Sequence, residues 1–185
     1  MNVYDFDKTI YKGDSSVDFW LFCMRKKPVI LFLIPYQVWK GVLYKAKIID
    51  KVSFKEAFFC FLRFLSNTED TVELFWDRNE KKIKEWYKKQ QKEDDLIISA
   101  SPYFLLKEIC KRIGVCNLIA TDVDKHTGKF HSENCYGDEK VRRFTLEYSD
   151  RKIEEFYSDS QTDYPLSRLA RHAYLVKENN IYEWR

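Results

Sequence analysis

Two aspartates separated by a single residue stand close to the start of the chain. Asp5 and Asp7 follow a short apolar segment that we expect to form a strand, and Thr9 comes two residues later. Near the other end, Asp159 and Asp163 lie four residues apart, where a strand is predicted to give way to a helix. Carboxylates in such positions can attack an electrophile, transfer protons or bind a hard divalent cation.

A serine and a lysine lie at the ends of other predicted elements. Ser99 ends the apolar run 95–99, which predicts a buried strand, and Lys140 lies near the start of a helix predicted over 138–148. Taken singly, an aspartate at a strand end usually forms a turn or caps a helix, and a helical lysine usually faces water. Because ligands of open α/β sheets bind at the carboxyl ends of the strands, the joint occurrence of these residues favours a functional site there.

At four places the sequence resembles the haloacid dehalogenase superfamily. Residues 5–9 (DFDKT) are similar to its first motif, D-x-D-x-T, residues 97–99 to its second, Lys140 to its third and residues 159–163 to its fourth. The segments 99–102 and 134–140 resemble the subgroup that contains phosphoserine phosphatase. The apolar, basic helical segment after the first motif resembles phosphatidylglycerophosphatase-type members of that subgroup.

The resemblance implies a phosphatase that forms an aspartyl-phosphate. Asp5 is then the nucleophile, and Asp7 is the general acid that protonates the leaving oxygen and later the base that deprotonates water. Ser99 and Ala100 bind phosphate oxygens together with Lys140, which also offsets negative charge. Because dehalogenases have no acid at the position of Asp7, the implied reaction is phosphate-ester hydrolysis.

The same resemblance implies Mg²⁺ as the cofactor. Its ligands are Asp5, the backbone carbonyl of Asp7 and Asp159, while Asp163 and Thr9 support this set. Two like charges about 4 Å apart repel by about 4 kcal/mol at an effective dielectric constant of about 20, so clustered carboxylates beside a phosphate favour a cation. Carboxylate and carbonyl oxygens are the donors that Mg²⁺ prefers.

Asp14 is the candidate for substrate specificity. The resemblance places it where phosphoserine phosphatases carry a glutamate that helps read the amino group of the substrate. Its shorter side chain leaves three substrates open: a small phosphomonoester, phosphoserine, and a phosphate on a membrane lipid headgroup. A phospho-receiver signalling domain also uses clustered aspartates, but there the acceptor follows a later strand and no helical insertion interrupts the first.

Alternating strands and helices in the second half of the chain predict an α/β fold. We expect strands over 95–99, 117–123, 153–157 and 173–176, and helices over 101–114, 138–148 and 162–171. Residues 14–92 show helical patterns throughout, including a capping box at Ser53 and Glu56. The resemblance implies a Rossmann-like three-layer core with a parallel sheet, formed by 1–13 and 93–185, and an all-helical cap formed by 14–92.

The composition favours a globular protein in a reducing, cytoplasmic setting, since 45% of residues are hydrophobic and the five cysteines show no C-x-x-C spacing. A net charge of only +3 gives no case for nucleic-acid binding. The cations of the helical segment are expected to form a solvated helix face, and the alternative is that they attract an anionic substrate or a membrane surface. They are Arg25, Lys26, Lys27, Lys81, Lys82, Lys84, Lys88, Lys89 and Lys92. The apolar stretch 28–44 is too short to span a bilayer, which leaves two alternatives: it packs within the cap, or it makes peripheral contact with an anionic membrane.

Overall fold

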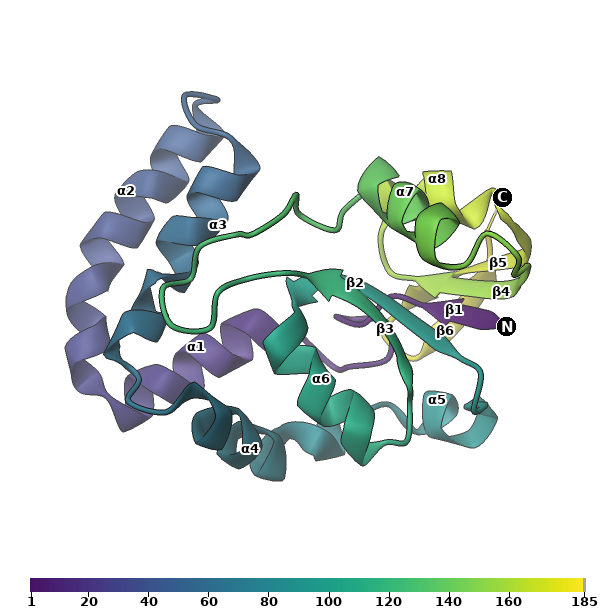
Figure 1. Cartoon of the computed structure of the whole chain (residues 1–185), viewed down its shortest axis with the longest axis horizontal. Helices are drawn as coiled ribbons and strands as arrows, with labels where there is room; N and C mark the ends of the chain where they lie inside the picture. Colours follow the sequence, from purple (N-terminus) through teal and green to yellow (C-terminus); the bar gives the residue numbers. More distant parts are fainter. Residues whose placement is uncertain (185) are drawn as a thin grey trace.

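A six-stranded sheet runs through the middle of the molecule, which a computed structural model describes for residues 1–184 (Figure 1). The strands are β1 (Asn2–Tyr4), β2 (Leu96–Pro102), β3 (Asn117–Thr121), β4 (Ile153–Ser158), β5 (Ala170–Lys177) and β6 (Asn180–Glu183). They lie in the order β3-β2-β1-β4-β5-β6, in which the first five are parallel and β6 is antiparallel to β5. The predicted α/β fold is confirmed, with β6 as an edge strand that the sequence patterns did not indicate.

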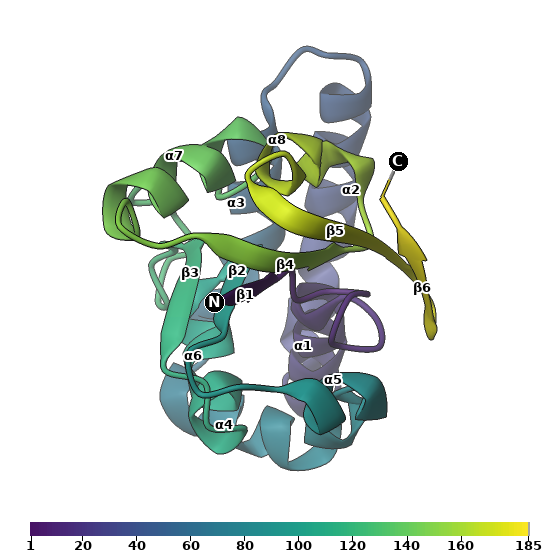
Figure 2. The same cartoon turned by 90° about the vertical axis from the view of Figure 1, so that its right-hand side faces the viewer.

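Helices cover both faces of this sheet (Figure 2). They are α1 (Ser15–Lys26), α2 (Ile34–Lys45), α3 (Lys51–Phe59), α4 (Thr68–Asn79), α5 (Glu85–Gln90), α6 (Tyr103–Arg112), α7 (Asp138–Glu147) and α8 (Tyr164–Ser167). Short 3₁₀ helices span Pro28–Leu33, Cys60–Phe64, Glu80–Lys82 and Gln161–Asp163. On one face of the sheet lie α7 and α8, and on the other lie α1, α4, α5 and α6, whereas α2 and α3 extend away as an antiparallel pair.

Alternate residues of the inner strands point to opposite faces of the sheet and build two hydrophobic clusters. Val3 and Ile98 belong to the cluster beneath α7 and α8, while Tyr4 and Ile97 belong to the cluster beneath α6. All four side chains are fully buried. Because a shift by one residue would exchange the two faces, this burial fixes the register in which Tyr4 of β1 pairs with Ile97 of β2.

The helical segment 14–92 packs into the same interior as the sheet. Phe19 of α1 and Phe75 and Trp76 of α4 share one hydrophobic cluster with strand residues and with α6. The Trp76 indole donates a hydrogen bond to the Leu105 carbonyl oxygen (2.8 Å) and packs edge-on against the Phe6 ring, with centroids 6.0 Å apart. These contacts fix α4 to α6, so residues of this segment and of the sheet share a continuous core.

One face of α2 packs on α3. Gln37 donates a hydrogen bond to the Phe58 carbonyl oxygen (2.9 Å), and the Tyr44 ring stacks on the Phe54 ring with centroids 5.1 Å apart. The opposite face of α2 and much of the preceding 3₁₀ helix expose large apolar side chains. Of the two alternatives for the stretch 28–44, internal packing therefore accounts for the inner face alone. Within residues 1–184, every helix is too short or too polar to cross a membrane.

The start of α3 differs from the sequence prediction. The helix begins at Lys51, three residues earlier than the expected capping box indicates, because the Asp50 carboxylate accepts a hydrogen bond from the Ser53 N–H (2.6 Å) and caps it. Glu56 accepts instead from the Phe130 N–H (3.0 Å) of the loop that follows β3. A glutamate predicted to act locally thus connects two distant segments.

Two predicted helices are shorter than their sequence patterns indicate. The helix expected over 101–114 loses its first two residues to β2, which pairs with β3 as far as Pro102. The helix expected over 162–171 forms only a 3₁₀ turn followed by α8, because Ala170 already pairs with Ile153 between β5 and β4. Strand pairing between distant segments decides both boundaries, and local sequence patterns do not contain that information.

Candidate active site

The predicted site residues meet in one pocket at the C-terminal ends of β1, β2 and β4. Its volume of about 370 Å³ lies in the range of small-molecule sites. Asp5 and Asp159 directly follow β1 and β4, and Ser99 lies in β2. The lining includes every predicted side chain except Thr9, namely Asp5, Asp7, Asp14, Ser99, Ala100, Lys140, Asp159 and Asp163. Thr9 lies beneath them and is fully buried.

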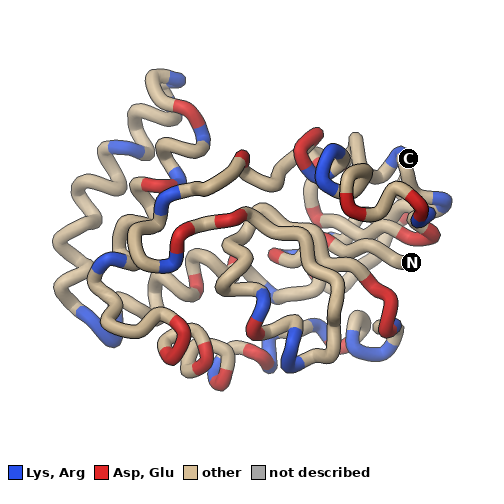
Figure 3. Tube along the Cα trace, viewed as in Figure 1, with Lys and Arg blue, Asp and Glu red and all other residues tan. Residues whose placement is uncertain are grey.

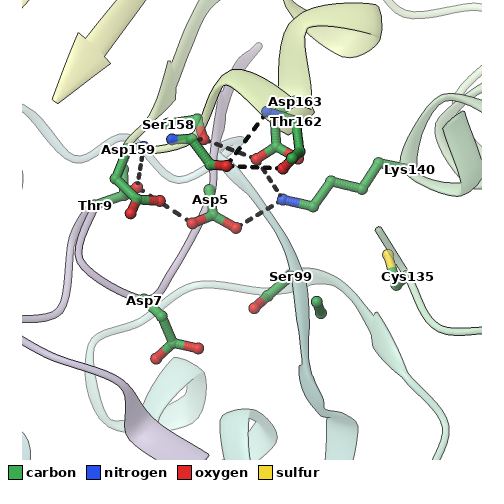
Figure 4. A network of polar contacts seen from close by, with 12 residues as sticks. Asp5, Asp7, Thr9, Ser99, Cys135, Lys140, Ser158, Asp159, Thr162 and Asp163 are labelled. Atoms are coloured by element: carbon green, nitrogen blue, oxygen red, sulfur yellow. Dashed lines mark hydrogen bonds and ion pairs between the residues drawn. The ribbon is translucent and has the colours of Figure 1, made fainter. Parts of the chain in front are cut away.

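Lys140 joins two carboxylates at the bottom of the pocket (Figure 4). Its ammonium group lies 2.7 Å from Asp5 Oδ1 and 2.7 Å from Asp163 Oδ2. Burial alone would lower the pKa of Lys140, but the two carboxylates outweigh burial and hold the pKa above its ordinary value. Asp163 also accepts a hydrogen bond from the Ser158 hydroxyl (2.7 Å). Lys140 is therefore a fixed cation throughout the neutral pH range.

Asp5 is held from its backbone and from its side chain. Its N–H donates to the Tyr157 carbonyl oxygen (2.9 Å), which keeps the residue beside β4. Its Oδ2 accepts from the Thr9 hydroxyl (3.2 Å), whose oxygen accepts in turn from the Asp159 N–H (2.9 Å). Burial raises the pKa of Asp5 to about 7 against the lowering effect of Lys140. Thr9 thus ties the ends of β1 and β4 together and brings Asp5 and Asp159 side by side (Figure 4).

The charge balance of this cluster fits a divalent cation. Asp5, Asp159 and Asp163 supply three carboxylates, and within residues 1–184 their ion pairs all involve the same cation, Lys140. Burial, reinforced by the Asp163 charge, raises the pKa of Asp159. No three His, Cys, Asp or Glu side chains of the described residues form a metal cluster by themselves. The set expected for Mg²⁺ needs only two carboxylates, Asp5 and Asp159, because its third ligand is a backbone carbonyl, and such hard oxygen donors suit that ion.

Asp7 is turned away from Lys140 and toward α1. Its Oδ1 accepts from the Ser15 N–H (2.6 Å), and its Oδ2 accepts a short hydrogen bond from the Ser101 hydroxyl. Burial and, next, the charge of Asp14 raise the pKa of Asp7 to about 6. Figure 4 shows its carboxyl group apart from the network around Lys140. A carboxyl group with a pKa this close to neutrality can both give and take a proton in the pocket.

Ser99 and Ala100 form the β2 side of the pocket. The Ser99 hydroxyl oxygen accepts from the Ser101 N–H (3.1 Å), so its own proton remains available for donation. The Ala100 carbonyl oxygen accepts from the Lys55 ammonium group (2.8 Å) and the Thr121 hydroxyl (3.1 Å). The serine can therefore serve an anionic oxygen, whereas the carbonyl group of Ala100 is already engaged by the protein.

Asp14 serves the fold as well as lining the pocket. It is the N-cap of α1, and its Oδ1 accepts a hydrogen bond from the Val17 N–H (3.0 Å). A capping carboxylate of this kind satisfies one of the free N–H groups of the first helical turn. Its position near Asp7 also adds negative charge to the α1 side of the pocket.

Two lysines of α3 line the pocket although the sequence patterns did not single them out. The Lys55 ammonium group donates to the Ala100 carbonyl oxygen and to Asn134 Oδ1, both at 2.8 Å. Burial lowers the pKa of Lys55 to about 8. One turn earlier, the Lys51 ammonium group lies 2.9 Å from the centroid of the Tyr136 ring. Among residues 1–184, neither lysine forms an ion pair with a carboxylate.

The four-residue spacing of these lysines is the feature of the sequence that could have identified them, since residues four apart share one face of a helix. Which face would turn to the pocket depends on how α3 packs against the rest of the chain. Aromatic rings of α3 complete the same wall, contributed by Phe54, Phe58 and Phe59. The pocket thus has a strand-end floor, formed by Asp5, Lys140, Asp159 and Asp163, and an α3 wall, formed by Lys51, Lys55 and these three rings.

Comparison with protein families agrees with this geometry. The family model described as haloacid dehalogenase-like hydrolase matches residues 3–168, which include every predicted site residue. The chain belongs to the haloacid dehalogenase-like hydrolase family. The family resemblance of the four motifs is thereby confirmed. A search of curated proteins gives no significant match.

Solved structures share the fold of this hydrolase at low sequence identity. A protein with unknown function from Bordetella pertussis Tohama I is 19% identical, with a TM-score of 0.76 over 94% of this chain and 87% of that one. A phosphoserine phosphohydrolase-like protein from Francisella tularensis subsp. tularensis SCHU S4 is 19% identical, with a TM-score of 0.57 over 94% and 86%. A probable phosphoserine phosphatase from Vibrio cholerae is 9% identical, with a TM-score of 0.61 over 93% and 55%. These matches show a common fold.

The loop between β1 and α1 of this hydrolase is held by a buried lysine. Lys84 donates hydrogen bonds to the carbonyl oxygens of Lys8 (2.5 Å) and Glu178. Lys8 has a φ of 58°, which is uncommon for a residue with a side chain, and its N–H donates to the Gly13 carbonyl oxygen (2.8 Å). The expectation that Lys84 belongs to a solvated helix face is wrong, because two backbone carbonyl groups take the place of water around its charge.

Proposed function

We propose that the chain is a Mg²⁺-dependent phosphatase that hydrolyses a phosphomonoester through an aspartyl-phosphate. One observation carries the proposal: Asp5 is buried at the end of β1, paired with Lys140 and hydrogen-bonded by Thr9, with Asp7 in the same pocket. Membership of a hydrolase family and the phosphoserine phosphatase-like structural neighbours support it. Residues 1–13 and 93–185 would form the catalytic core, and 14–92 the cap.

In the first half-reaction, a carboxylate oxygen of Asp5 bonds to phosphorus while the bond from phosphorus to the ester oxygen breaks. Asp7 supplies the proton that the leaving oxygen takes up. Since the pKa of Asp7 is raised to about 6, part of the population carries this proton at neutral pH. Lys140 holds its charge beside Asp5, where negative charge on the phosphoryl oxygens needs to be offset.

In the second half-reaction, a water oxygen bonds to phosphorus, and the bond from phosphorus to Asp5 breaks. Asp7, which gave up its proton in the first half, takes one from the attacking water. Inorganic phosphate leaves, Asp5 is again a carboxylate and Asp7 is again an acid. Through both halves, Ser99, Ala100 and Lys140 hold the phosphoryl oxygens, for which the free proton of the Ser99 hydroxyl is suited.

Asp5, Asp159 and the backbone carbonyl of Asp7 would hold the Mg²⁺ ion, with Asp163 and Thr9 in support. When bound, this ion supplies the positive charge that lets a phosphate dianion approach several carboxylates. The surplus of buried carboxylates over lysine in the strand-end floor supports this assignment.

Hydrolysis of para-nitrophenyl phosphate, measured with Mg²⁺ and with a chelator, tests the proposal. We expect turnover that requires the metal and that Asp5→Asn abolishes. Asp150→Asn provides a matched control, since Asp150 is an exposed aspartate that does not line the pocket. Equal rates for the wild type and Asp5→Asn would contradict the nucleophile assignment.

The α3 wall supports a substrate that carries a second anionic group. Lys55 uses two of its three N–H donors on protein acceptors, which leaves one for a ligand. Phosphoserine, with its carboxylate, and a phospholipid headgroup with a second phosphate both satisfy this requirement. Asp14, the proposed specificity residue, lines the same pocket. A panel of phosphorylated metabolites and dispersed lipids, ranked by kcat/KM, separates these substrates from phosphomonoesters that lack a second charge.

The five cysteines are all free thiols, and three of them are buried. Thiols kept in this state support the proposal of a reducing, cytoplasmic setting. The proposed ligand of the pocket is a small phosphorylated molecule rather than nucleic acid.

A further inference from the structure

The outer face of α2 is apolar and faces solvent. Val38, Trp39 and Val42 are 61%, 54% and 58% exposed, and Phe32 of the preceding 3₁₀ helix is 85% exposed. Their spacing places the three α2 residues on one side of the helix. We call these four side chains the outer α2 face. Contiguous exposed aromatic and aliphatic side chains of this size mark interaction sites on proteins.

The inner side of the same helix explains why this face is left open. Gln37 and Tyr44 contact α3 through the Phe58 carbonyl group and the Phe54 ring, as described above. An amphipathic helix with one packed side normally presents polar residues on its other side. Here α2 is apolar on both sides, so folding of the chain buries only one of its two apolar sides.

The charged residues of the segment that carries this face all have one sign. Between Asp18 and Asp50 the sequence contains six cations and no carboxylate; the cations are Arg25, Lys26, Lys27, Lys40, Lys45 and Lys47. Figure 3 shows basic residues but no Asp or Glu along α2, and no charged residue along the 3₁₀ helix before it. Because the whole chain has a net charge of only +3, this concentration of positive charge is local. Its electrostatic complement is an extended anionic surface.

We infer that the outer α2 face docks on an anionic lipid bilayer, with α2 lying in the plane of the interface. Aromatic and branched side chains of the face enter the boundary between headgroups and acyl chains, where Trp is favoured, and the flanking lysines contact anionic headgroups. With 12 residues, α2 is about 18 Å long, which suits this in-plane position and falls short of the hydrocarbon core of about 30 Å. The inference goes beyond the proposed function and does not depend on it.

Sedimentation with vesicles of equimolar phosphatidylserine and phosphatidylcholine tests the inference on the full chain. The wild type is expected to bind at low salt, to be released at high salt, and not to bind vesicles of phosphatidylcholine alone. The double variant Phe32→Glu and Trp39→Glu is expected to lower the partition coefficient at least about 100-fold. The double variant Lys27→Gln and Lys45→Gln is expected to lower it about 30-fold.

Matched controls lie away from α2, on α7 and α5 (Figure 1). Leu146→Glu makes the same apolar-to-acidic change at a residue of α7 that is 69% exposed, and Lys88→Gln with Lys89→Gln removes two exposed lysines of α5. Both controls should bind vesicles as the wild type does. Hydrolysis of para-nitrophenyl phosphate in solution should be unchanged in every variant, which separates this inference from the phosphatase proposal.

Three outcomes would overturn the inference. The wild type could fail to bind the anionic vesicles at low salt, or Phe32→Glu with Trp39→Glu could bind them as tightly as the wild type. In the third outcome, analytical ultracentrifugation would find that the wild type is a dimer, that Phe32→Glu with Trp39→Glu is a monomer, and that vesicles do not disrupt the dimer. The outer α2 face would then be an interface between two copies of the chain.

Discussion

The lysine of the strand-end floor is neutralised by carboxylates of the protein, whereas the lysines of the α3 wall are not. In the floor, the Lys140 ammonium group is bound by Asp5 and Asp163 at 2.7 Å each, and Thr9 bridges to Asp159. In the wall, Lys55 is bound only by uncharged acceptors. The side chains of the floor already bond to one another and leave a surplus of carboxylates, whereas the wall contains cations that form no ion pair with a carboxylate.

This difference separates two tasks. Groups that react must be held in one geometry, because a displacement of about 1 Å can cost a factor of about 100 in rate. Groups that recognise a substrate contribute more binding free energy if no protein group neutralises their charge beforehand. The substrate anion then forms an ion pair that exists only in the complex. We therefore expect changes in the floor to lower kcat and changes in the wall to raise KM.

The largest effect is expected from Asp5→Asn in the floor. An amide cannot form the aspartyl-phosphate, so kcat should fall by about 10⁴-fold or more. Single-turnover assays with radiolabelled phosphate should show a protein-bound phosphoryl group in the wild type and none in the variant. A labelled Asp5→Asn protein would assign the nucleophile to another residue.

Asp7→Asn should lower kcat by about 10²- to 10⁴-fold, because it removes the acid of the first half-reaction and the base of the second. The pKa of Asp7 is raised to about 6. Where protonation of the leaving oxygen limits the rate, kcat should fall as the pH rises above about 6, since the acid form is then lost. A pH–rate profile of the variant should lack this limb, and an unchanged limb would place the acid elsewhere.

Lys55→Gln in the wall should raise KM about 10-fold for substrates with a second anionic group and change kcat by less than about 2-fold. Because the pKa of Lys55 is lowered to about 8, the wild type should lose this advantage as the pH rises through that value. Lys107→Gln, at an exposed lysine of α6, is the matched control. An equal loss of kcat and kcat/KM would mean that Lys55 belongs with the floor.

The smallest effect concerns stability. Burial raises the folded-state pKa of Asp5 from its ordinary 3.8 to about 7. The neutral carboxyl group therefore stabilises the folded state below about pH 4, and this stabilisation is lost as the pH rises to about 7. In the presence of a chelator, Asp5→Asn should therefore raise the Tm at neutral pH by about 2–4 °C, which is roughly 1 kcal/mol, and by less near pH 4.

The effect of Mg²⁺ on the Tm of the wild type and of Asp5→Asn tests whether Asp5 is a metal ligand. Calorimetry should show that the ion raises the Tm of the wild type more than that of Asp5→Asn, because the amide is a weaker ligand. Equal shifts in the two proteins would remove Asp5 from the proposed metal site without bearing on the nucleophile assignment, which single turnover tests independently.

The floor was predictable from sequence and the wall was not. Asp5 and Asp159 directly follow β1 and β4, and the carboxyl ends of parallel strands meet wherever the sheet forms. Lys51 and Lys55 reach the pocket only because α3 packs with that face inward, which depends on contacts such as that of Glu56 with the Phe130 N–H. For the same reason, the length of α8 and the edge strand β6 could not be predicted, since pairing between distant segments determines them.

The contacts of Lys84 have a consequence for the order in which the protein is made. Its ammonium group joins the carbonyl oxygens of Lys8 and Glu178, and the Asp5 N–H donates to the Tyr157 carbonyl oxygen. Synthesis proceeds from the N-terminus, so residues 5–13 leave the ribosome long before their partners exist. Residues 5–13 are thus synthesised well before they can reach their final conformation. A nascent chain that lacks the turn between β5 and β6 cannot yet form the contact of Lys84 with Glu178.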